Sequence, residues 1–250
     1  MRVLKIGGNE LNDPDFLPGL AGWVAEKTSS GQSITIVHGG GSDIAAIQSQ
    51  LGLAPKKVDG LRVTDAHALT VAQMVLSGHV NKQIVTALLA AGVDAVGLSG
   101  VDGRLLTARK KAHPTVNLGL VGEIIDVRTV LLTNLSQNGI TAVVSPISIG
   151  QDNLIYNVNA DEAASAIAQA LQADMLDFIS NVPSVLKNGK TMPHLTAAQT
   201  ETLINEGIIN GGMVPKVRGA LTAVAQGVSR ARIVNLTGLL QSGGTIFSQQ

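Results

Sequence analysis

The sequence predicts an α/β fold, a three-layer α/β/α sandwich with a mostly parallel central sheet and two lobes. Short apolar runs rich in Val and Ile alternate with longer amphipathic stretches along the 250 residues. This alternation is typical of strands and helices in a parallel sheet. The strand candidates are continuously apolar, as strands are when helices cover both faces of a sheet.

The predicted strands are residues 2–6, 33–38, 95–99, 142–145, 175–180 and 232–236. The predicted helices are residues 17–27, 43–51, 65–77, 80–91, 128–137, 161–171, 197–206 and 215–226. Asn188 and Gly189 predict a hairpin turn, because both tolerate the positive φ angles of a type I′ turn. A mild boundary after an Ala-rich helix divides the chain into an N-terminal lobe, residues 1–173, and a C-terminal lobe, residues 174–250. We expect the two lobes to share one sheet.

Composition excludes several classes of protein. Eighteen Lys and Arg residues balance eighteen Asp and Glu residues, and only 2% of residues are aromatic. A nucleic-acid-binding protein usually has a basic face or aromatic stacking platforms, so we expect no nucleic-acid partner. The chain has no cysteine, which excludes disulfides, thiolate nucleophiles and sulfur-ligated metals. No apolar run approaches the length of a membrane span or a signal peptide, so we expect a cytoplasmic protein.

Glycines cluster where predicted strands end. Lys5 and Ile6 are followed by Gly7 and Gly8, and His38 is followed by residues 39–42, Gly-Gly-Gly-Ser, just before a helix. Ligands bind at the carboxyl ends of strands in such sheets, and glycine lets backbone N–H groups approach an anion. Neither loop has P-loop or dinucleotide-binding spacing. Residues 97–101 are not the serine hydrolase motif, because Val101 stands where that motif has glycine. Taken alone, the glycine triplet at residues 39–41 is better explained as a tight strand-to-helix turn.

Two lysines and a polar helix start are candidate catalytic groups. Lys5 alone is weak evidence, because a lysine at a strand end is usually just solvated. Lys216 lies near a helix start, where the helix dipole disfavours cations, so a bound anion and a surface lysine explain it equally well. Asn157, Asn159 and Asp161 exceed what one helix cap requires. A carboxylate there could hold lysine ammonium groups.

Arg62 precedes a helix capped by Thr64 or Asp65, and its guanidinium could bind a carboxylate in bidentate fashion. Most arginines at such positions are only surface residues. The five histidines show no metal-binding spacing, and we interpret them as structural or surface residues. Together these features suit phosphoryl transfer, which needs positioning and positive charge more than covalent help. No side chain clearly serves as a base, so an acceptor that is already anionic fits best.

In sequence order, the motifs are those of a known family. They are residues 4–8 (Leu-Lys-Ile-Gly-Gly), 37–41 (Val-His-Gly-Gly-Gly), 60–65 (Gly-Leu-Arg-Val-Thr-Asp), 80–82 (Val-Asn-Lys), 97–100 (Gly-Leu-Ser-Gly), 118–123 (Leu-Gly-Leu-Val-Gly-Glu), 157–161 (Asn-Val-Asn-Ala-Asp) and 212–216 (Gly-Met-Val-Pro-Lys). Over nearly its whole length the chain resembles the acetylglutamate kinases of the amino-acid kinase family. The resemblance implies the fold of that family and phosphorylation of the side-chain carboxylate of N-acetyl-L-glutamate by ATP with Mg²⁺, in arginine biosynthesis.

The resemblance also assigns residues. Lys5 and Lys216 match the transition-state lysines, and Asp161 matches the residue that organises them. The matches to the acyl-amino-acid site are Gly40, Gly41, Arg62 and Asn157. The matches to the ATP site are Gly7, Gly8, Asn181, Val182, Pro183, Ser184, Val185, Leu186, Ile208, Ile209, Asn210, Gly211, Gly212 and Met213. Members of the family hold magnesium mainly through ATP, so no protein metal ligand is predicted.

Three further expectations follow from the resemblance. Arginine-inhibited members carry an extra N-terminal helix that links dimers into a ring. The first strand here begins at Arg2, so we expect a homodimer without strong arginine inhibition. Asn181 and His79 depart from common family residues, and the Ser-Asn-Val-Pro run at 180–183 is similar to kinases that act on carrier-protein-linked aminoadipate or glutamate in lysine biosynthesis. Those kinases are the alternative. A non-catalytic amino-acid sensor is disfavoured, because Lys5, Asp161 and Lys216 are all present.

Overall fold

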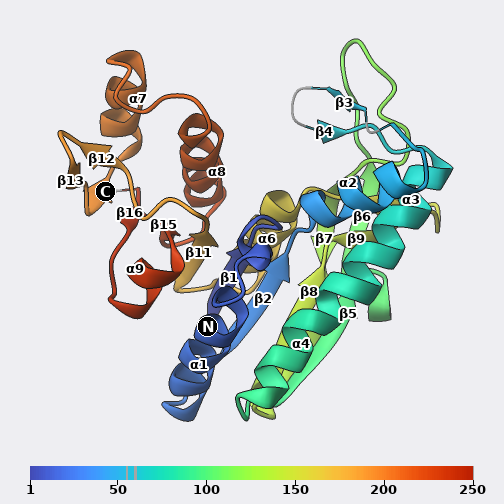
Figure 1. Cartoon of the computed structure of the whole chain (residues 1–250), viewed down its shortest axis with the longest axis horizontal. Coiled ribbons are helices and arrows are strands. Elements are labelled where there is room, and N and C mark those ends of the chain that lie inside the picture. The colour runs from blue at the N-terminus through green and yellow to red at the C-terminus, as the bar shows by residue number, and fades with distance from the viewer. Residues whose placement is uncertain (55, 59–60, 250) are drawn as a thin grey trace.

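An eight-stranded sheet forms the centre of the molecule. The computed structural model describes residues 1–54, 56–58 and 61–249, and the strands run in the order β14-β16-β15-β11-β1-β2-β8-β5 (Figure 1). Every neighbouring pair is parallel except β15 and β16. The bounds are β1 (Arg2–Ile6), β2 (Ile34–His38), β5 (Ala95–Ser99), β8 (Thr141–Ser145), β11 (Met175–Ile179), β14 (His194–Leu195), β15 (Ala231–Val234) and β16 (Thr245–Phe247).

Helices cover both faces of this sheet. One face carries α5 (Thr129–Gln137), α6 (Ala160–Ala170) and α8 (Met213–Ala225), and the other carries α1 (Phe16–Ser29), α4 (Asn81–Ala90) and α9 (Leu236–Leu240). Successive side chains of a strand point to opposite faces. On β1, Val3 accordingly belongs to the first core and Leu4 to the second. The predicted three-layer α/β/α sandwich is confirmed.

A second, four-stranded sheet was not predicted. Its order is β10-β9-β6-β7, formed by β6 (Leu106–Lys110), β7 (Gly122–Val127), β9 (Ile147–Gly150) and β10 (Ile155–Asn157). These strands lack a continuous apolar run, since β6 ends in the exposed Arg109 and Lys110 and β7 contains the exposed Asp126. They are stabilised by antiparallel pairing and by packing of α6 on β7.

One long helical stretch replaces two predicted helices. The segments α3 (Ala66–Gln73), η2 (Met74–Val80) and α4 (Asn81–Ala90) follow one another without a break, and η2 is π-helical. The predicted interruption near Gly78 is therefore wrong. Buried apolar residues on both sides of Gly78, among them Leu76 and Val80, give the stretch one packed face that outweighs the low helix propensity of glycine.

The remaining helices and strands are short, and one hairpin was predicted. They include α2 (Gly41–Gln50), α7 (Ala197–Asn205), β3 (Lys57–Val58), β4 (Leu61–Arg62), β12 (Leu186–Lys187), β13 (Lys190–Thr191) and the one-turn helices η1 (Glu10–Asn12) and η3 (Asp102–Arg104). Asn188 and Gly189 have φ angles of 53° and 73°, which confirms the positive φ angles predicted for the β12–β13 hairpin.

The last predicted strand is too long. Strand β15 stops at Val234 rather than at residue 236, because the Asn235 side chain accepts a hydrogen bond from the Gly238 N–H and starts α9. Of the helices in the described residues, none combines the length and hydropathy that a membrane crossing requires. The parallel strands β1, β2, β8 and β11 all end at the same edge of the sheet, where the predicted site residues lie.

Candidate active site

An ion pair joins the end of β1 to the start of α6. The Lys5 Nζ lies 2.9 Å from Asp161 Oδ1, and the Lys5 side chain keeps only 16% of its surface exposed. Asn159 caps α6 by accepting a hydrogen bond from the Asp161 N–H at 2.7 Å. Asp161 therefore lies in the first helical turn, where a carboxylate is favoured by the helix dipole. The predicted contact of Asp161 with a lysine is present for Lys5.

The neighbouring Glu162 anchors the same helical turn to the second sheet. Its carboxylate accepts hydrogen bonds from Lys111 Nζ at 2.7 Å and from the backbone N–H of Ile124, on β7, at 3.2 Å. Helix α6 is therefore held at its N-terminus from two sides. This fixes the carboxylate of Asp161 beside Lys5.

The two glycine loops meet backbone to backbone. A Cβ atom at Gly8 would come within 2.8 Å of the Gly40 Cα and 2.9 Å of the Gly41 nitrogen. No residue with a side chain fits there without moving a backbone segment. Glycine at position 8 thus lets two strand ends close around one space, which a simple turn at either strand would not require.

His38 supports the second glycine loop, residues 39–42, through a hydrogen-bond contact with Gly39. It is fully buried, and its Nδ1 lies 2.9 Å from the Gly39 carbonyl oxygen while its Nε2 lies 3.2 Å from Asn81 Nδ2. The Asn81 amide also donates to the Val143 carbonyl at 2.9 Å. Burial lowers the pKa of His38 to about 4, so the ring is neutral near pH 7. A neutral ring that donates from Nδ1 and accepts at Nε2 satisfies both contacts.

Arg62 lies on β4, and its side chain lines the same space as the two glycine loops. Its guanidinium donates to Gln48 Oε1 and, at 3.1 Å, to the Gly41 carbonyl oxygen. Burial lowers the pKa of Arg62 from its ordinary value. The predicted motif at residues 60–65 begins with Gly60, which lies outside the described residues. Arg62 itself is half-buried and lines a cavity, so it is not a plain surface arginine.

Asn157 is linked to the Arg62 segment through Thr64. Its Nδ2 donates to the Thr64 hydroxyl at 3.2 Å, and that hydroxyl donates to the Arg62 carbonyl at 2.9 Å. Thr64 is fully buried. The cap of α3 is Asp65, which accepts from the Ala68 N–H at 2.8 Å. Because Asp65 caps the helix, the Thr64 hydroxyl can link Asn157 to Arg62, the two predicted substrate-binding residues.

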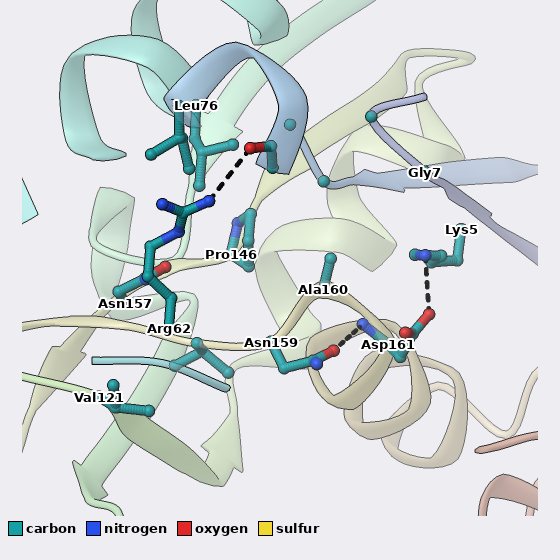
Figure 2. Close-up of a pocket in the computed structure, with 16 residues that line it drawn as sticks. Lys5, Gly7, Arg62, Leu76, Val121, Pro146, Asn157, Asn159, Ala160 and Asp161 are labelled. Carbon is teal, nitrogen blue, oxygen red and sulfur yellow. Dashed lines mark hydrogen bonds and ion pairs between the residues drawn. The ribbon is translucent and has the colours of Figure 1, made fainter. Parts of the chain in front are cut away.

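These groups enclose a cavity of about 250 Å³. Figure 2 shows Arg62 and Asn157 at one side of it and the Lys5–Asp161 pair at the other. The glycine loops and an apolar group complete the lining; the apolar residues are Ile44, Leu76, Val121, Pro146, Val158 and Ala160. Cationic groups at both ends of a partly apolar cavity suit a small molecule with two anionic groups and an apolar substituent.

Comparison with known proteins identifies the family. The model of the amino acid kinase family matches residues 1–235. The chain belongs to this family. The kinase is 51% identical over 247 residues to a protein named acetylglutamate kinase from Roseiflexus castenholzii, which covers 99% of the kinase and 94% of the relative. It is 42% identical to a protein of the same name from Methanopyrus kandleri, covering 98% of the kinase and 99% of the relative.

A solved structure agrees with this assignment. The kinase superposes on the crystal structure of the smu.665 protein from Streptococcus mutans UA159 with a TM-score of 0.82 and 28% identity, covering all of the kinase and 98% of that chain. The predicted family and fold class are therefore confirmed.

Lys216 faces a second cavity of the kinase, of about 450 Å³, which shares Lys5, Gly7 and Gly8 with the first. The Lys216 Nζ donates to Asn181 Oδ1 at 3.3 Å. Burial lowers the pKa of Lys216, which the negative charges of Glu10 and Asp161 raise and the positive charge of Lys5 lowers further. In the described residues Lys216 has no ion pair, so Asp161 contacts only one of the two lysines directly.

The predicted nucleotide residues lie in four kinds of environment: lining a cavity, buried, partly buried and exposed. Asn181 lines the second cavity, and Gly212 lines a smaller one together with Lys5, Asp161 and Lys216. Val185 and Ile209 are core residues and Ser184 is buried, so only their backbone groups could contact a ligand. Partly buried positions are Val182, Ile208 and Met213, and exposed positions are Pro183, Leu186, Asn210 and Gly211.

The sequence analysis assigns no role in the site to five residues that shape it. Gln48 and Thr64 orient predicted substrate residues, His38 and Asn81 support a glycine loop, and Glu10 lines the second cavity. Only Glu10 had a local signal, since a carboxylate two residues after a Gly-Gly turn lies close to any anion bound there. In the part of the chain that the structure describes, no three His, Asp or Glu side chains are grouped to bind a metal ion.

Proposed function

We propose that the kinase transfers the terminal phosphoryl group of ATP to the side-chain carboxylate of N-acetyl-L-glutamate, producing an acyl phosphate in arginine biosynthesis. The observation that carries the proposal is the first cavity, with Arg62 at one end and the Lys5–Asp161 pair at the other. An arginine that is already hydrogen-bonded to Gly41 is suited to bind the α-carboxylate. The 51% identity to a protein named acetylglutamate kinase supports this acceptor.

The proposed roles follow the two cavities. Gly40, Gly41, Arg62 and Asn157 bind the acyl amino acid in the first cavity. ATP binds across the second, with its phosphates along Gly7 and Gly8 and its nucleoside against residues 181–186 and 208–213. Lys5 and Lys216 neutralise the charge of the transferring phosphoryl group, and Asp161 positions Lys5. Residues 1–173 thus serve mainly the acyl amino acid and residues 174–250 mainly ATP.

No general base is required for this reaction, because the acceptor carboxylate is already ionised at neutral pH. One of its oxygen atoms attacks the terminal phosphorus of ATP, and ADP leaves with the electrons of the broken P–O bond. Catalysis then depends on in-line positioning and on positive charge around the phosphoryl oxygens. Mg²⁺ that arrives with ATP supplies part of that charge.

The direct test traps the product with hydroxylamine, which converts an acyl phosphate into a coloured hydroxamate. The kinase is incubated with ATP, Mg²⁺ and one of three acceptors: N-acetyl-L-glutamate, free glutamate or carrier-linked aminoadipate. We expect hydroxamate with N-acetyl-L-glutamate only. Turnover with the carrier-linked substrate alone would favour the lysine-biosynthesis alternative, and no turnover with any acceptor would favour a sensor.

We further propose that the kinase is a cytoplasmic homodimer. Strand β5 ends the eight-stranded sheet, and Met74 and Leu89 on the adjoining helical stretch are 55% and 53% exposed. An unpaired strand edge beside exposed large apolar side chains is suited to association with a second copy. Light scattering at micromolar concentration should give twice the chain mass; a monomer or hexamer would contradict the proposal. Weak arginine inhibition stays a prediction that the same hydroxamate assay checks.

A further inference from the structure

Glu10 is the acidic residue in the lining of the second cavity. It opens the one-turn helix η1 directly after the first glycine loop. Its carboxylate lies against Gly7, so closely that a side chain at position 7 would collide with it. The same cavity is lined by Gly8, Asn181 and Lys216. A half-buried carboxylate therefore stands beside the backbone along which the phosphates of ATP are proposed to lie.

The charge of Glu10 is not compensated by a direct contact. Within residues 1–54, 56–58 and 61–249, its carboxylate has no ion pair and accepts no hydrogen bond. Asp161, the other carboxylate near the phosphates, is paired with Lys5 at 2.9 Å. The cavity lining contains two lysines, Lys5 and Lys216. Lys5 is the one paired with Asp161, and the Lys216 ammonium group is hydrogen-bonded to Asn181, although the charge of Glu10 raises the pKa of Lys216.

A carboxylate without a direct cationic partner has opposite effects on two forms of a nucleotide. A metal-free triphosphate brings several negative charges next to it, and the repulsion is strong in a partly desolvated cavity. A triphosphate loaded with a divalent cation brings a positive centre instead. Carboxylate oxygens are preferred ligands of Mg²⁺, which commonly binds between one or two carboxylates and the phosphates of a substrate.

We propose that Glu10 makes nucleotide binding depend on the divalent cation, by repelling the metal-free triphosphate and favouring the metal-loaded one. The proposal rests on the proposed function, because it places ATP in the second cavity. It assigns Glu10 a role in specificity and gives it no part in the chemical step. In this proposal the Glu10 carboxylate supplies a protein oxygen for the divalent cation, whereas the family resemblance predicts no protein metal ligand.

Calorimetric titration with AMP-PNP, a non-hydrolysable ATP analogue, tests the proposal without turnover. Binding is measured once with excess EDTA and once with excess Mg²⁺. We expect wild-type protein to bind the magnesium form at least about tenfold more tightly. In Glu10→Gln, affinity for the metal-free form should rise several-fold while affinity for the magnesium form falls or stays constant. The ratio of the two affinities should then shrink by roughly tenfold.

Two variants serve as controls. Asp15→Asn removes the same charge at an exposed position outside the cavity lining and should keep the wild-type ratio. Glu10→Asp retains the charge on a shorter side chain and should restore part of the ratio that Glu10→Gln loses. Thermal unfolding of each variant shows whether it is folded at the temperature of the titration.

The outcomes separate the two proposals. Equal changes in both affinities, or an unchanged ratio in Glu10→Gln, would overturn the role of Glu10 while the hydroxamate assay still yields acyl phosphate. Wild-type protein that binds no AMP-PNP with Mg²⁺ and makes no hydroxamate would overturn the proposed function, and the role of Glu10 with it.

Discussion

The two lysines of the site are held in different ways. Lys5 is the next-to-last residue of the central strand β1, is mostly buried, and contacts Asp161 at 2.9 Å. Lys216 lies in the first turn of α8, has no ion pair in the described residues, and contacts only the amide oxygen of Asn181, at 3.3 Å. Burial lowers the pKa of Lys216, because its ammonium group is partly removed from water without a direct anionic partner.

This difference indicates which part of the site is preformed. Lys5, Asp161 and the glycine loops belong to the central sheet and to a helix fixed at its N-terminus, so their geometry depends on the fold. By the proposed function, Lys216 would gain an anionic partner when ATP occupies the cavity beside it. In the reaction proposed above, a preformed cation would lower the cost of organising the site, and the second cation would add stabilisation as negative charge moves onto the transferring group.

The largest expected effect comes from removing the preformed cation. Lys5→Met should lower kcat by about 10³-fold, because it removes a charge from the transition state and leaves Asp161 unpaired beside the phosphates. The hydroxamate assay measures the rate, and thermal unfolding shows whether the fold is retained. Lys27→Met is the matched control, since Lys27 pairs with Glu26 far from the site at the other end of α1. A loss below about tenfold would contradict the role of Lys5.

His38, which is hydrogen-bonded to the second glycine loop, predicts that the folded protein becomes less stable at acidic pH. The folded-state pKa of His38, about 4, lies below its ordinary value of 6.5, so the unfolded chain binds the proton first. The stability due to neutral His38 is complete above about pH 6.5 and is lost as the pH falls towards 4. Between about pH 7 and pH 4.5 the free energy of unfolding should fall by about 2 to 3 kcal/mol through this residue.

Urea unfolding at the two pH values isolates this contribution by comparison of variants. His38→Gln keeps a hydrogen-bonding side chain without the titrating ring and should show a correspondingly smaller loss between the two pH values. The exposed His67→Gln should lose as much as wild type. An identical pH dependence in His38→Gln and wild type would show that the His38 ring does not titrate as its burial requires.

Lys216→Met should have a somewhat smaller effect than Lys5→Met, about 10²-fold on kcat, because an aqueous cavity can partly screen the missing charge. The KM for N-acetyl-L-glutamate should change by less than about threefold, since Lys216 does not line the first cavity. Steady-state kinetics with saturating ATP separate the two parameters. A change confined to KM would mean that Lys216 binds substrate and does not act in the transition state.

The sequence predicts the framework of the fold better than its connections. Strands 2–6 and 95–99 are predicted to the residue, because their apolar runs are bounded by glycine or a polar turn. Strands β6 and β7 are missed because their stability comes from pairing with each other and from α6 rather than from a continuous apolar run. Local patterns report burial well and report antiparallel pairing of half-exposed strands poorly.

The same division holds for the site. Strand ends and the α6 cap bring Lys5, Asp161 and the glycine loops together, and these were foreseeable from local sequence. The contact of Asn157 with Thr64 joins residues 93 positions apart, and the absence of a direct Asp161–Lys216 contact depends on how α8 packs. Such side-chain contacts between distant elements follow from tertiary packing, which no local pattern encodes.

The smallest expected effect is on the pH dependence of activity. It tests Lys216, the lysine that has no ion pair in the described residues. Lys216 acts as a cation, and burial lowers its pKa, so activity should be full at lower pH and fall as the pH rises through that lowered pKa. The alkaline limb of kcat/KM, which reports the free enzyme, should therefore lie below the ordinary lysine pKa. Lys216→Arg keeps a charge that is not lost in this range, and it should move the limb to higher pH even though its peak rate is lower. An alkaline limb at the same pH in both proteins would show that the alkaline loss of activity does not come from Lys216.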